Sequence, residues 1–310
     1  MRVLFWGTPE FAVPALRALI GEGFEVASVV TQPDKPVGRS RSILESPPVK
    51  KVALEESLRV LQPERPRGDE FIGQIKKLAP DISVVVAYGH ILTTEVIELP
   101  RLGTINIHAS LLPKYRGAAP IQAAIRGGDA ETGVTIMRMV RALDAGPSIH
   151  QVRTPIPPDE TYGELQMRLA ELGALALIEA LALLGMGAVT EVAQDDTLAT
   201  FAPKVDRAMT RVDWAGSASE VARTIRAYDP RPGAVSRVKG AEVKLFGARL
   251  APSTTSAAPG EVIQINDGGM VVACGTGAVT ISSVHPAGKK RIAPVEWLRG
   301  RGISLGERLS

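Results

Sequence analysis

The sequence predicts an α/β protein in two parts: a doubly wound, mostly parallel sheet, followed by a small β-barrel domain. The chain opens as an apolar strand, a turn, a helix and a second strand, which is how doubly wound sheets begin. A later run at 81–87 is apolar on both faces, as strands buried in parallel sheets are. After residue 230 the pattern changes to short strands separated by Gly-containing turns, which is typical of a small barrel.

The opening unit carries no dinucleotide fingerprint. The first strand is expected at 2–5, and the first helix at 11–20, where apolar residues recur at helical spacing until glycines end it. A second strand is expected at 25–30. The turn before the helix contains Gly7 alone and lacks the G-x-G-x-x-G pattern that holds a pyrophosphate, so a bound NAD or FAD is not expected.

A long polar segment, 31–51, follows the second strand and is predicted to be a loop. It contains four prolines and few apolar residues. Loops of this length are usually either functional or disordered. Because it leaves the carboxyl end of a strand, we interpret it as a lid over a site, in preference to a surface insertion.

The rest of the first part alternates between helices and strands. Apolar spacing predicts helices at 49–57, 70–78, 121–126 and 161–184. It predicts strands at 58–61, 81–87, 104–108, 132–140 and 148–154. We therefore expect a first domain that spans residues 1–184.

The second part is expected to form a separate domain. Residues 185–205 are less regular and are interpreted as a linker, which leaves 206–310 for the second domain. A helix is expected there at 219–227. Strands are expected at 234–238, 242–249, 261–265, 269–273 and 279–285.

Composition favours a protein of the reducing cytoplasm without a membrane segment. The single cysteine among 310 residues, Cys274, excludes an internal disulfide and a cysteine-based zinc site. The amino terminus lacks the features of a signal peptide. The Ala/Leu-rich run at 172–184 contains Glu179 and is too short to span a bilayer.

Charge is unevenly distributed between the two parts. Residues 1–205 contain 21 Lys and Arg against 24 Asp and Glu, whereas residues 206–310 contain 15 against 9. The basic second part is consistent with binding to a polyanion and equally with an ordinary basic surface.

Three polar residues are expected to meet at one edge of the sheet. Asn106 and His108 leave the same face of the strand at 104–108, and Asp144 lies in a loop that we expect at the same edge. Such a group allows an imidazole to polarise or protonate a carbonyl-derived oxygen, an amide to donate a second hydrogen bond, and a carboxylate to orient the imidazole. The alternative for His108 is a structural role in the strand.

Two other kinds of site are not favoured. A serine hydrolase is not favoured because the G-x-S-x-G elbow is absent and Ser110 is the only serine near the group. A metal site is not expected because no histidines and carboxylates have the spacing of metal ligands.

Several motifs resemble those of the 10-formyltetrahydrofolate-dependent formyltransferases. H-A-S-L-L-P-K-Y-R-G-A-A-P-I-Q at 108–122 resembles the active-site signature of that family. G-T-P-E-F, T-Q-P-D-K-P-V-G-R, V-V-A-Y-G, D-A-E-T-G-V-T-I-M and L-D-A-G resemble its other first-domain motifs, in the same order. D-D-T-L-A-T-F-A-P-K, R-V-D-W, I-R-A-Y-D-P-R-P-G-A and P-A-G-K-K resemble the second domain of the members that act on tRNA.

The resemblance implies a Rossmann-like catalytic domain followed by an OB-like domain that holds tRNA. It implies 10-formyltetrahydrofolate as the donor, the α-amino group of methionyl initiator tRNA as the acceptor, a role in translation initiation and no metal. Asn106, His108 and Asp144 would form the catalytic trio. Formylation of a sugar-nucleotide amine and a non-enzymatic tRNA- or folate-binding protein are the alternatives, and the protein is expected to be a monomer.

The resemblance also implies binding residues. Folate is expected to contact Val86, Ala87, Tyr88, Gly89, Ile91, Leu92, Ser110, Leu111, Leu112, Pro113, Arg141 and Leu143. Transfer RNA is expected to contact Arg39, Arg41, Lys114, Arg116, Lys204, Lys289, Lys290 and Arg291. For Lys114 and Arg116 the glutamate tail of folate is an equal alternative, and for Lys289, Lys290 and Arg291 a solvated turn is the alternative.

Overall fold

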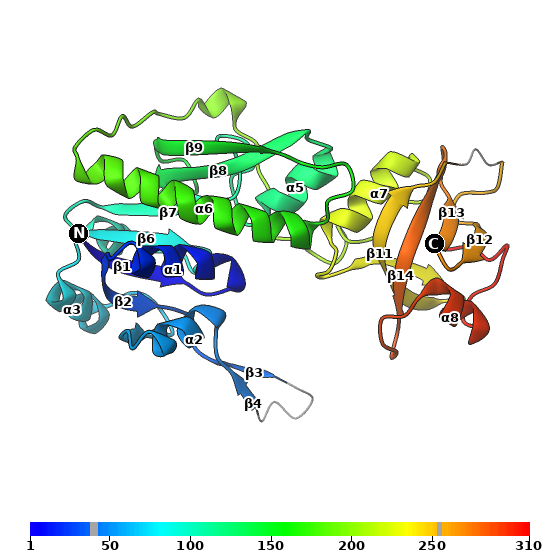
Figure 1. Ribbon diagram of the computed structural model, residues 1–310, viewed down its shortest axis with the longest axis horizontal. Helices are drawn as coiled ribbons and strands as arrows, with labels where there is room; N and C mark the ends of the chain where they lie inside the picture. Colours follow the sequence, from blue (N-terminus) through cyan, green and yellow to red (C-terminus); the bar gives the residue numbers. More distant parts are fainter. Residues whose placement is uncertain (38–42, 253–255) are drawn as a thin grey trace. The chain divides into compact units, whose positions relative to one another are not determined.

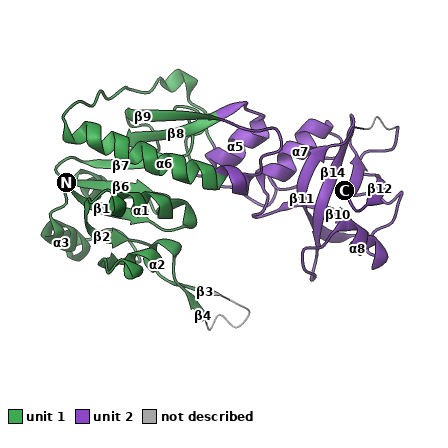
Figure 2. Ribbon diagram, in the orientation of Figure 1, with its two compact units in different colours: residues 1–117, 132–154, 166–201 green, residues 118–131, 155–165, 202–310 purple. Residues whose placement is uncertain are grey.

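The computed structural model describes residues 1–37, 43–252 and 256–310, which form two compact units (Figure 2). Unit 1 consists of residues 1–117, 132–154 and 166–201. Unit 2 consists of residues 118–131, 155–165 and 202–310.

Unit 1 is built on a seven-stranded sheet with the order β5-β2-β1-β6-β7-β8-β9 (Figure 1). Its strands are β1 Arg2–Gly7, β2 Glu25–Val30, β5 Val60–Leu61, β6 Ile82–Val86, β7 Thr104–His108, β8 Glu131–Arg138 and β9 Ser148–Pro155. The pairs β2–β5, β1–β2, β1–β6 and β6–β7 are parallel, and β7–β8 is antiparallel. The predicted Rossmann-like, mostly parallel sheet is therefore confirmed.

Helices cover both faces of this sheet. They are α1 Val13–Gly21, α2 Pro48–Glu55, α3 Asp69–Leu78, α4 Thr94–Glu98 and α6 Tyr162–Gly185, with short 3₁₀ turns at Glu10–Ala12 and Asp196–Leu198. Residues of α3 and α4 pack with Trp6 and Tyr88 in one buried cluster. Gly173 of α6 lies so near β7 that a Cβ there would sit 2.9 Å from Ile107 Cγ2. One face of β7 is therefore closed by α6.

The segment predicted as an irregular loop, 31–51, contains a short hairpin. Strands β3 Lys35–Val37 and β4 Ile43–Glu45 pair in antiparallel register. The side chains of Ile43 and Leu44 are each 66% exposed. The prediction of a loop was wrong at these strands because polar residues and prolines hide a pairing that depends on hydrogen bonds more than on burial.

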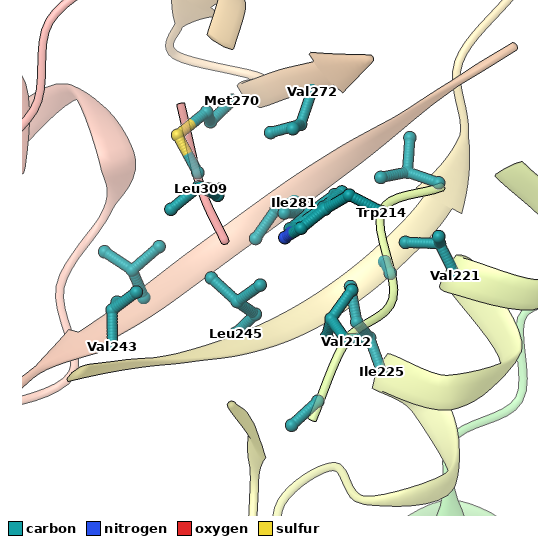
Figure 3. Close-up of a cluster of buried hydrophobic side chains, with 14 of the residues drawn as sticks. Val212, Trp214, Val221, Ile225, Val243, Leu245, Met270, Val272, Ile281 and Leu309 are labelled. Atoms are coloured by element: carbon teal, nitrogen blue, oxygen red, sulfur yellow. The ribbon is translucent and has the colours of Figure 1, made fainter. Parts of the chain in front are cut away.

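The sheet of unit 2 has five strands in the order β10-β11-β14-β13-β12, and each strand pairs with its neighbour in antiparallel register. Its elements are α5 Pro120–Gly127, α7 Ala218–Ala227, β10 Ala234–Val238, β11 Ala241–Leu250, β12 Val262–Asn266, β13 Gly269–Ala273, β14 Ala278–Pro286 and α8 Pro294–Arg299. Trp214 is 5% exposed and packs among Val221, Ile225 and Ile281 (Figure 3). The predicted small β-rich domain is confirmed.

Among the described residues, no helix is both long enough and apolar enough to cross a membrane.

Candidate active site

Strand β7 presents Asn106 and His108 on the face opposite α6. Side chains alternate along a strand, so the two polar residues share the face that Ile107 does not occupy. The side chain of His108 is buried, at 5% exposed, and Asn106 is half-buried. An imidazole surrounded by protein atoms rather than by water interacts more strongly with neighbouring charges.

Asp144 reaches His108 by a route that the sequence did not predict. Because β8 runs antiparallel to β7, its carboxyl end lies at the opposite end of β7, where Met139 N donates to Thr104 O over 2.9 Å. The loop then returns, and Asp144 Oδ2 lies 3.7 Å from His108 Nδ1. The expected reason, a common carboxyl edge, was wrong, although the two side chains do come together.

Hydrogen bonds hold both members of this pair. His108 Nε2 lies 2.9 Å from the carbonyl oxygen of Tyr115, and Asp144 Oδ2 accepts from Gly117 N over 2.8 Å. A carbonyl oxygen can only accept, so Nε2 is the nitrogen that donates to Tyr115 O, and Nδ1 is the nitrogen that faces the Asp144 carboxylate. A substrate oxygen that took the place of the Tyr115 carbonyl at Nε2 would receive the same hydrogen bond.

The segment interpreted as a linker, 185–205, contributes residues that sequence reasoning missed. Gln194 donates from Nε2 to the carbonyl oxygens of Asp144 and Gly146, over 2.8 and 2.7 Å. It accepts from Arg116, whose guanidinium also donates to Asp196. Arg116 is 6% exposed, so protein atoms rather than solvent surround this proposed tRNA or folate contact. Periodicity gave no signal, because this segment lacks a regular pattern.

An open pocket of about 960 Å³ lies beside part of the predicted folate-binding set. Gly89, Ile91, Leu92 and Arg141 line it, together with residues 64–67. The side chain of Ile91 is 91% exposed. Leu143, which also belongs to the predicted set, is 61% exposed. Exposed apolar side chains and backbone groups of this kind suit the face and edge of a planar ring.

The other members of the predicted folate-binding set range from buried to exposed, and four of them, Val86, Tyr88, Ser110 and Leu112, are buried. The Tyr88 side chain is 1% exposed and packs edge-on against Trp6, and burial raises the pKa of its hydroxyl to about 12. Its carbonyl oxygen already accepts from Thr8 Oγ1 over 2.8 Å. Ser110 Oγ donates to Lys114 O. Val86 and Leu112 are also buried, Leu111 and Pro113 are half-buried, and Ala87 is exposed.

The predicted tRNA contacts differ in their surroundings. Arg39 and Arg41 lie outside the described residues. Lys114, Lys204, Lys289 and Lys290 are exposed. Arg291 stacks on Phe246, with Cζ 4.0 Å from the ring centre, and donates from Nε to Ser283 Oγ over 2.7 Å. No group of three or more His, Cys, Asp or Glu side chains suited to a metal ion occurs among residues 1–37, 43–252 and 256–310.

Comparison with known proteins identifies the class. A model of the formyl transferase family matches residues 1–181, and a model of the formyl transferase C-terminal domain matches residues 204–302. The chain therefore belongs to the formyl transferase family, as its motifs indicated.

Within that family the chain groups with the methionyl-tRNA formyltransferases. It is 46% identical over 308 residues to the methionyl-tRNA formyltransferase of Aromatoleum aromaticum, covering 99% of this chain and 96% of that one. It is 44% identical over 307 residues to that of Moorella thermoacetica, covering 99% and 98%. This identity over whole chains makes the protein an enzyme of the one-carbon transferase class.

A solved structure shares the fold. HypX from Aquifex aeolicus, in complex with tetrahydrofolic acid, superposes with a TM-score of 0.69 at 23% identity. The match covers 96% of this chain and 47% of HypX, so the chain spans about half the length of that protein. At this identity the likeness establishes the fold alone.

Proposed function

We propose that the protein transfers the formyl group of 10-formyltetrahydrofolate to the α-amino group of methionyl initiator tRNA, in the cytoplasm and as a monomer, for translation initiation. The approach of Asp144 Oδ2 to within 3.7 Å of His108 Nδ1, beside Asn106 on the same face of β7, is the observation that carries this proposal. This arrangement brings together an imidazole that can donate a proton, a carboxylate that orients it and an amide that donates a hydrogen bond.

The chemistry assigns each group of the trio a task. The neutral amine attacks the formyl carbon, a new C–N bond forms, and the carbonyl electrons move to oxygen. Asn106 donates one hydrogen bond to that oxygen, and the Nε2–H of His108 donates a second when it turns from the Tyr115 carbonyl to the substrate, while Asp144 orients the imidazole. The attacking nitrogen then gives up a proton. Collapse of the tetrahedral intermediate restores the C=O bond and breaks the bond to N10, which takes a proton as tetrahydrofolate leaves.

The donor is assigned to the open pocket beside residues 89–92 and the 141–143 loop. Ile91 and Leu143 offer exposed apolar surface to the ring system, and backbone groups near Gly89 offer hydrogen bonds to its edge. Arg65, Arg67 and Arg141 line the same pocket and carry charge opposite to that of a glutamate tail. The side chain of Tyr88 takes no part in this proposal, because it is buried beside Trp6.

The acceptor is assigned to exposed basic groups. Three of these groups are exposed lysines, Lys204, Lys289 and Lys290. Lys289 and Lys290 lie in 206–310, the part of the sequence with the higher positive charge. Arg39 and Arg41 are included from sequence resemblance alone. We assign the chemistry to residues 1–184, the connection to 185–205, and the principal hold on tRNA to 206–310. Lys114, also exposed, is assigned to the acceptor end of the tRNA.

A formyl-transfer assay tests the proposal. The purified protein is mixed with 10-formyltetrahydrofolate and one of three acceptors: methionine-charged initiator tRNA, free methionine or an amino-sugar nucleotide. We expect release of tetrahydrofolate with the charged tRNA only. Transfer to the sugar nucleotide would keep the chemistry and overturn the acceptor, and no transfer to any acceptor would overturn both. Size-exclusion chromatography with light scattering checks the monomer.

A further inference from the structure

The segment after α6 runs along unit 1 and joins the two loops that hold the proposed catalytic group. At one end Val192 exchanges backbone hydrogen bonds of 2.8 and 2.9 Å with Ser148, which follows the Asp144 loop. At the other end Thr200 accepts from Tyr115 N and Arg116 N, each over 2.9 Å. Gln194 lies between these two attachments.

The side-chain amide of Gln194 uses all of its hydrogen-bonding capacity in this place. Nε2 donates to Asp144 O over 2.8 Å and to Gly146 O over 2.7 Å. Oε1 accepts from Arg116 Nε over 3.1 Å and Nη2 over 2.8 Å. The opposite orientation would set NH₂ against guanidinium donors and the oxygen against carbonyls, so only one orientation satisfies every partner.

Arg116 connects Gln194 to the backbone groups that hold the pair. Its guanidinium is buried and is further fixed by a bond of 2.7 Å from Nη2 to Asp196 Oδ1. Its chain neighbours are Tyr115, whose carbonyl meets His108 Nε2, and Gly117, whose N–H meets the Asp144 carboxylate. One amide therefore spans both sides of the His108–Asp144 contact.

The turn that Gln194 holds is not one that the backbone prefers by itself. Asp144 has φ of +48°, in the left-handed region that non-glycine residues seldom adopt. Such a conformation persists when surrounding contacts determine it. The two carbonyls that Gln194 engages belong to Asp144 itself and to Gly146, two residues further along.

We propose that Gln194 is a positioning residue for formyl transfer, which holds the Asp144 turn so that the carboxylate faces His108. The inference rests on the proposed function, because it requires His108 and Asp144 to act on the reacting groups. Gln194 itself touches neither substrate in this proposal; it acts through Asp144.

The variant Gln194→Glu tests the two hydrogen bonds that Gln194 Nε2 donates to the Asp144 turn. Glutamate keeps the size of the side chain and the acceptor for Arg116, and it replaces both N–H donors by an oxygen that faces two carbonyls. We expect kcat to fall about 10²-fold, the order found when reacting groups are displaced by about 1 Å. KM for each substrate should stay unchanged. Asp195→Asn is the matched control, because the carboxylate of that exposed neighbour accepts from Thr197 and not from the Asp144 turn, and it should keep full activity.

A double-mutant cycle separates positioning from general structure. In an Asp144→Asn background, Gln194→Glu should cause no further loss of kcat, because residues that act as one unit are not additive. Three results would overturn the inference. The first is a wild-type kcat in Gln194→Glu, and the second is an equal loss of kcat in the wild-type and Asp144→Asn backgrounds. The third is a loss of kcat accompanied by weaker tetrahydrofolate binding and a lower Tm. Full activity of Asp144→Asn alone would instead overturn the proposed role of Asp144.

Discussion

The carboxylate of Asp144 contacts the imidazole of His108 at the carboxyl end of β7, although the loop that carries Asp144 starts beside the amino end of that strand. Oδ2 and Nδ1 are 3.7 Å apart, whereas Met139, at the start of the loop, is bonded to Thr104 at the other end of β7. The contact between His108 and Asp144 therefore depends more on the conformation of the loop at 139–147 than on the pairing of the strands. Changes in the loop should alter activity while the sheet remains intact.

Removal of the imidazole tests the assignment of His108. His108→Ala should lower the rate of formyl transfer by roughly 10²–10⁴-fold, the usual contribution of a positioned proton donor or acceptor. Tetrahydrofolate binding should persist, because the pocket assigned to the folate ring is lined by residues 89–92 and Arg141, and His108 does not line it. Titration calorimetry measures binding and the transfer assay measures the rate.

A second histidine variant serves as the control. His150 lies on β9 and pairs with Glu179 over 2.6 Å, and it has no task in the proposed chemistry. His150→Ala should retain the wild-type rate. A His108→Ala variant with normal turnover would remove the imidazole from the mechanism.

A substitution at Gly146 tests whether the conformation of the loop between β8 and β9, which carries Asp144, controls the reaction. A Cβ at this position would collide with the carbonyl oxygen of Arg138, so Gly146→Ala requires the two ends of the loop to separate. A displacement of about 1 Å lowers turnover about 10²-fold when it reaches the reacting groups. Single-turnover kinetics with saturating substrates measures the reduced rate.

The same substitution in an open position is the matched control. Gly73 lies within α3, and a Cβ there would meet no atom within 4 Å. Gly73→Ala should leave kcat unchanged and raise the free energy of unfolding by about 0.5–1 kcal/mol. Equal turnover in the Gly146→Ala and Gly73→Ala variants would mean that the loop path does not control the reaction.

Sequence patterns predicted the elements that apolar periodicity defines. The predicted strands at 25–30, 234–238 and 269–273 agree at both ends with β2, β10 and β13. These runs are bounded by Gly, Asp or other turn residues, so the pattern marks where they begin and end. The helix α4, Thr94–Glu98, was missed because one turn of helix is too short to show a period.

The candidate site was harder to predict for two physical reasons. Periodicity carries no information on strand direction, so the antiparallel course of β8 and the returning loop of Asp144 could not be read from it. Tyr88 follows β6, and a residue that comes after a strand buried on both faces carries no periodic signal for the direction of its side chain, which lies in the core. Gln194 was missed because a hydrogen bond to a backbone carbonyl needs no particular neighbour in sequence.

Exposed lysines after β14 provide a test of tRNA binding by charge. Lys289→Ala combined with Lys290→Ala should raise KM for charged tRNA and leave KM for 10-formyltetrahydrofolate unchanged. The slope of log affinity against log salt concentration should become shallower by roughly 0.7–0.9 for each phosphate that the variant no longer neutralises. Filter binding at several salt concentrations measures that slope.

Two lysines of unit 1 control for the removal of charge itself. Lys76 and Lys77 are exposed in the last turn of α3, so the pair of alanine substitutions removes the same charge. This variant should keep the wild-type slope. A slope that changes equally in both double variants would assign tRNA attraction to net charge and not to a site.

The first turn of α7 gives a pH-dependent test of stability in unit 2. Glu220 Oε2 accepts from Ser217 Oγ over 2.7 Å and from Ser217 N over 2.8 Å, and these bonds, the first above all, lower the pKa of the Glu220 carboxyl. A carboxyl whose pKa is lower in the folded state stabilises that state above its ordinary value of 4.5, and the effect disappears as pH falls through the lowered pKa. Ser217→Ala should itself cost about 1 kcal/mol, because it removes the N-cap.

Amide hydrogen exchange of the α7 backbone measures this effect locally. At pH 7 the backbone amides of α7 should exchange faster in the Glu220→Gln variant than in the wild type. This difference in exchange rate should vanish once pH falls below the lowered pKa of Glu220, because the wild-type carboxyl is then protonated in the folded state as well. Asp267→Asn is the control, because it removes an exposed carboxylate of the turn between β12 and β13 and leaves the cap intact. A difference in α7 that stayed constant from neutral to acidic pH would show that the Glu220 charge does not contribute to the cap.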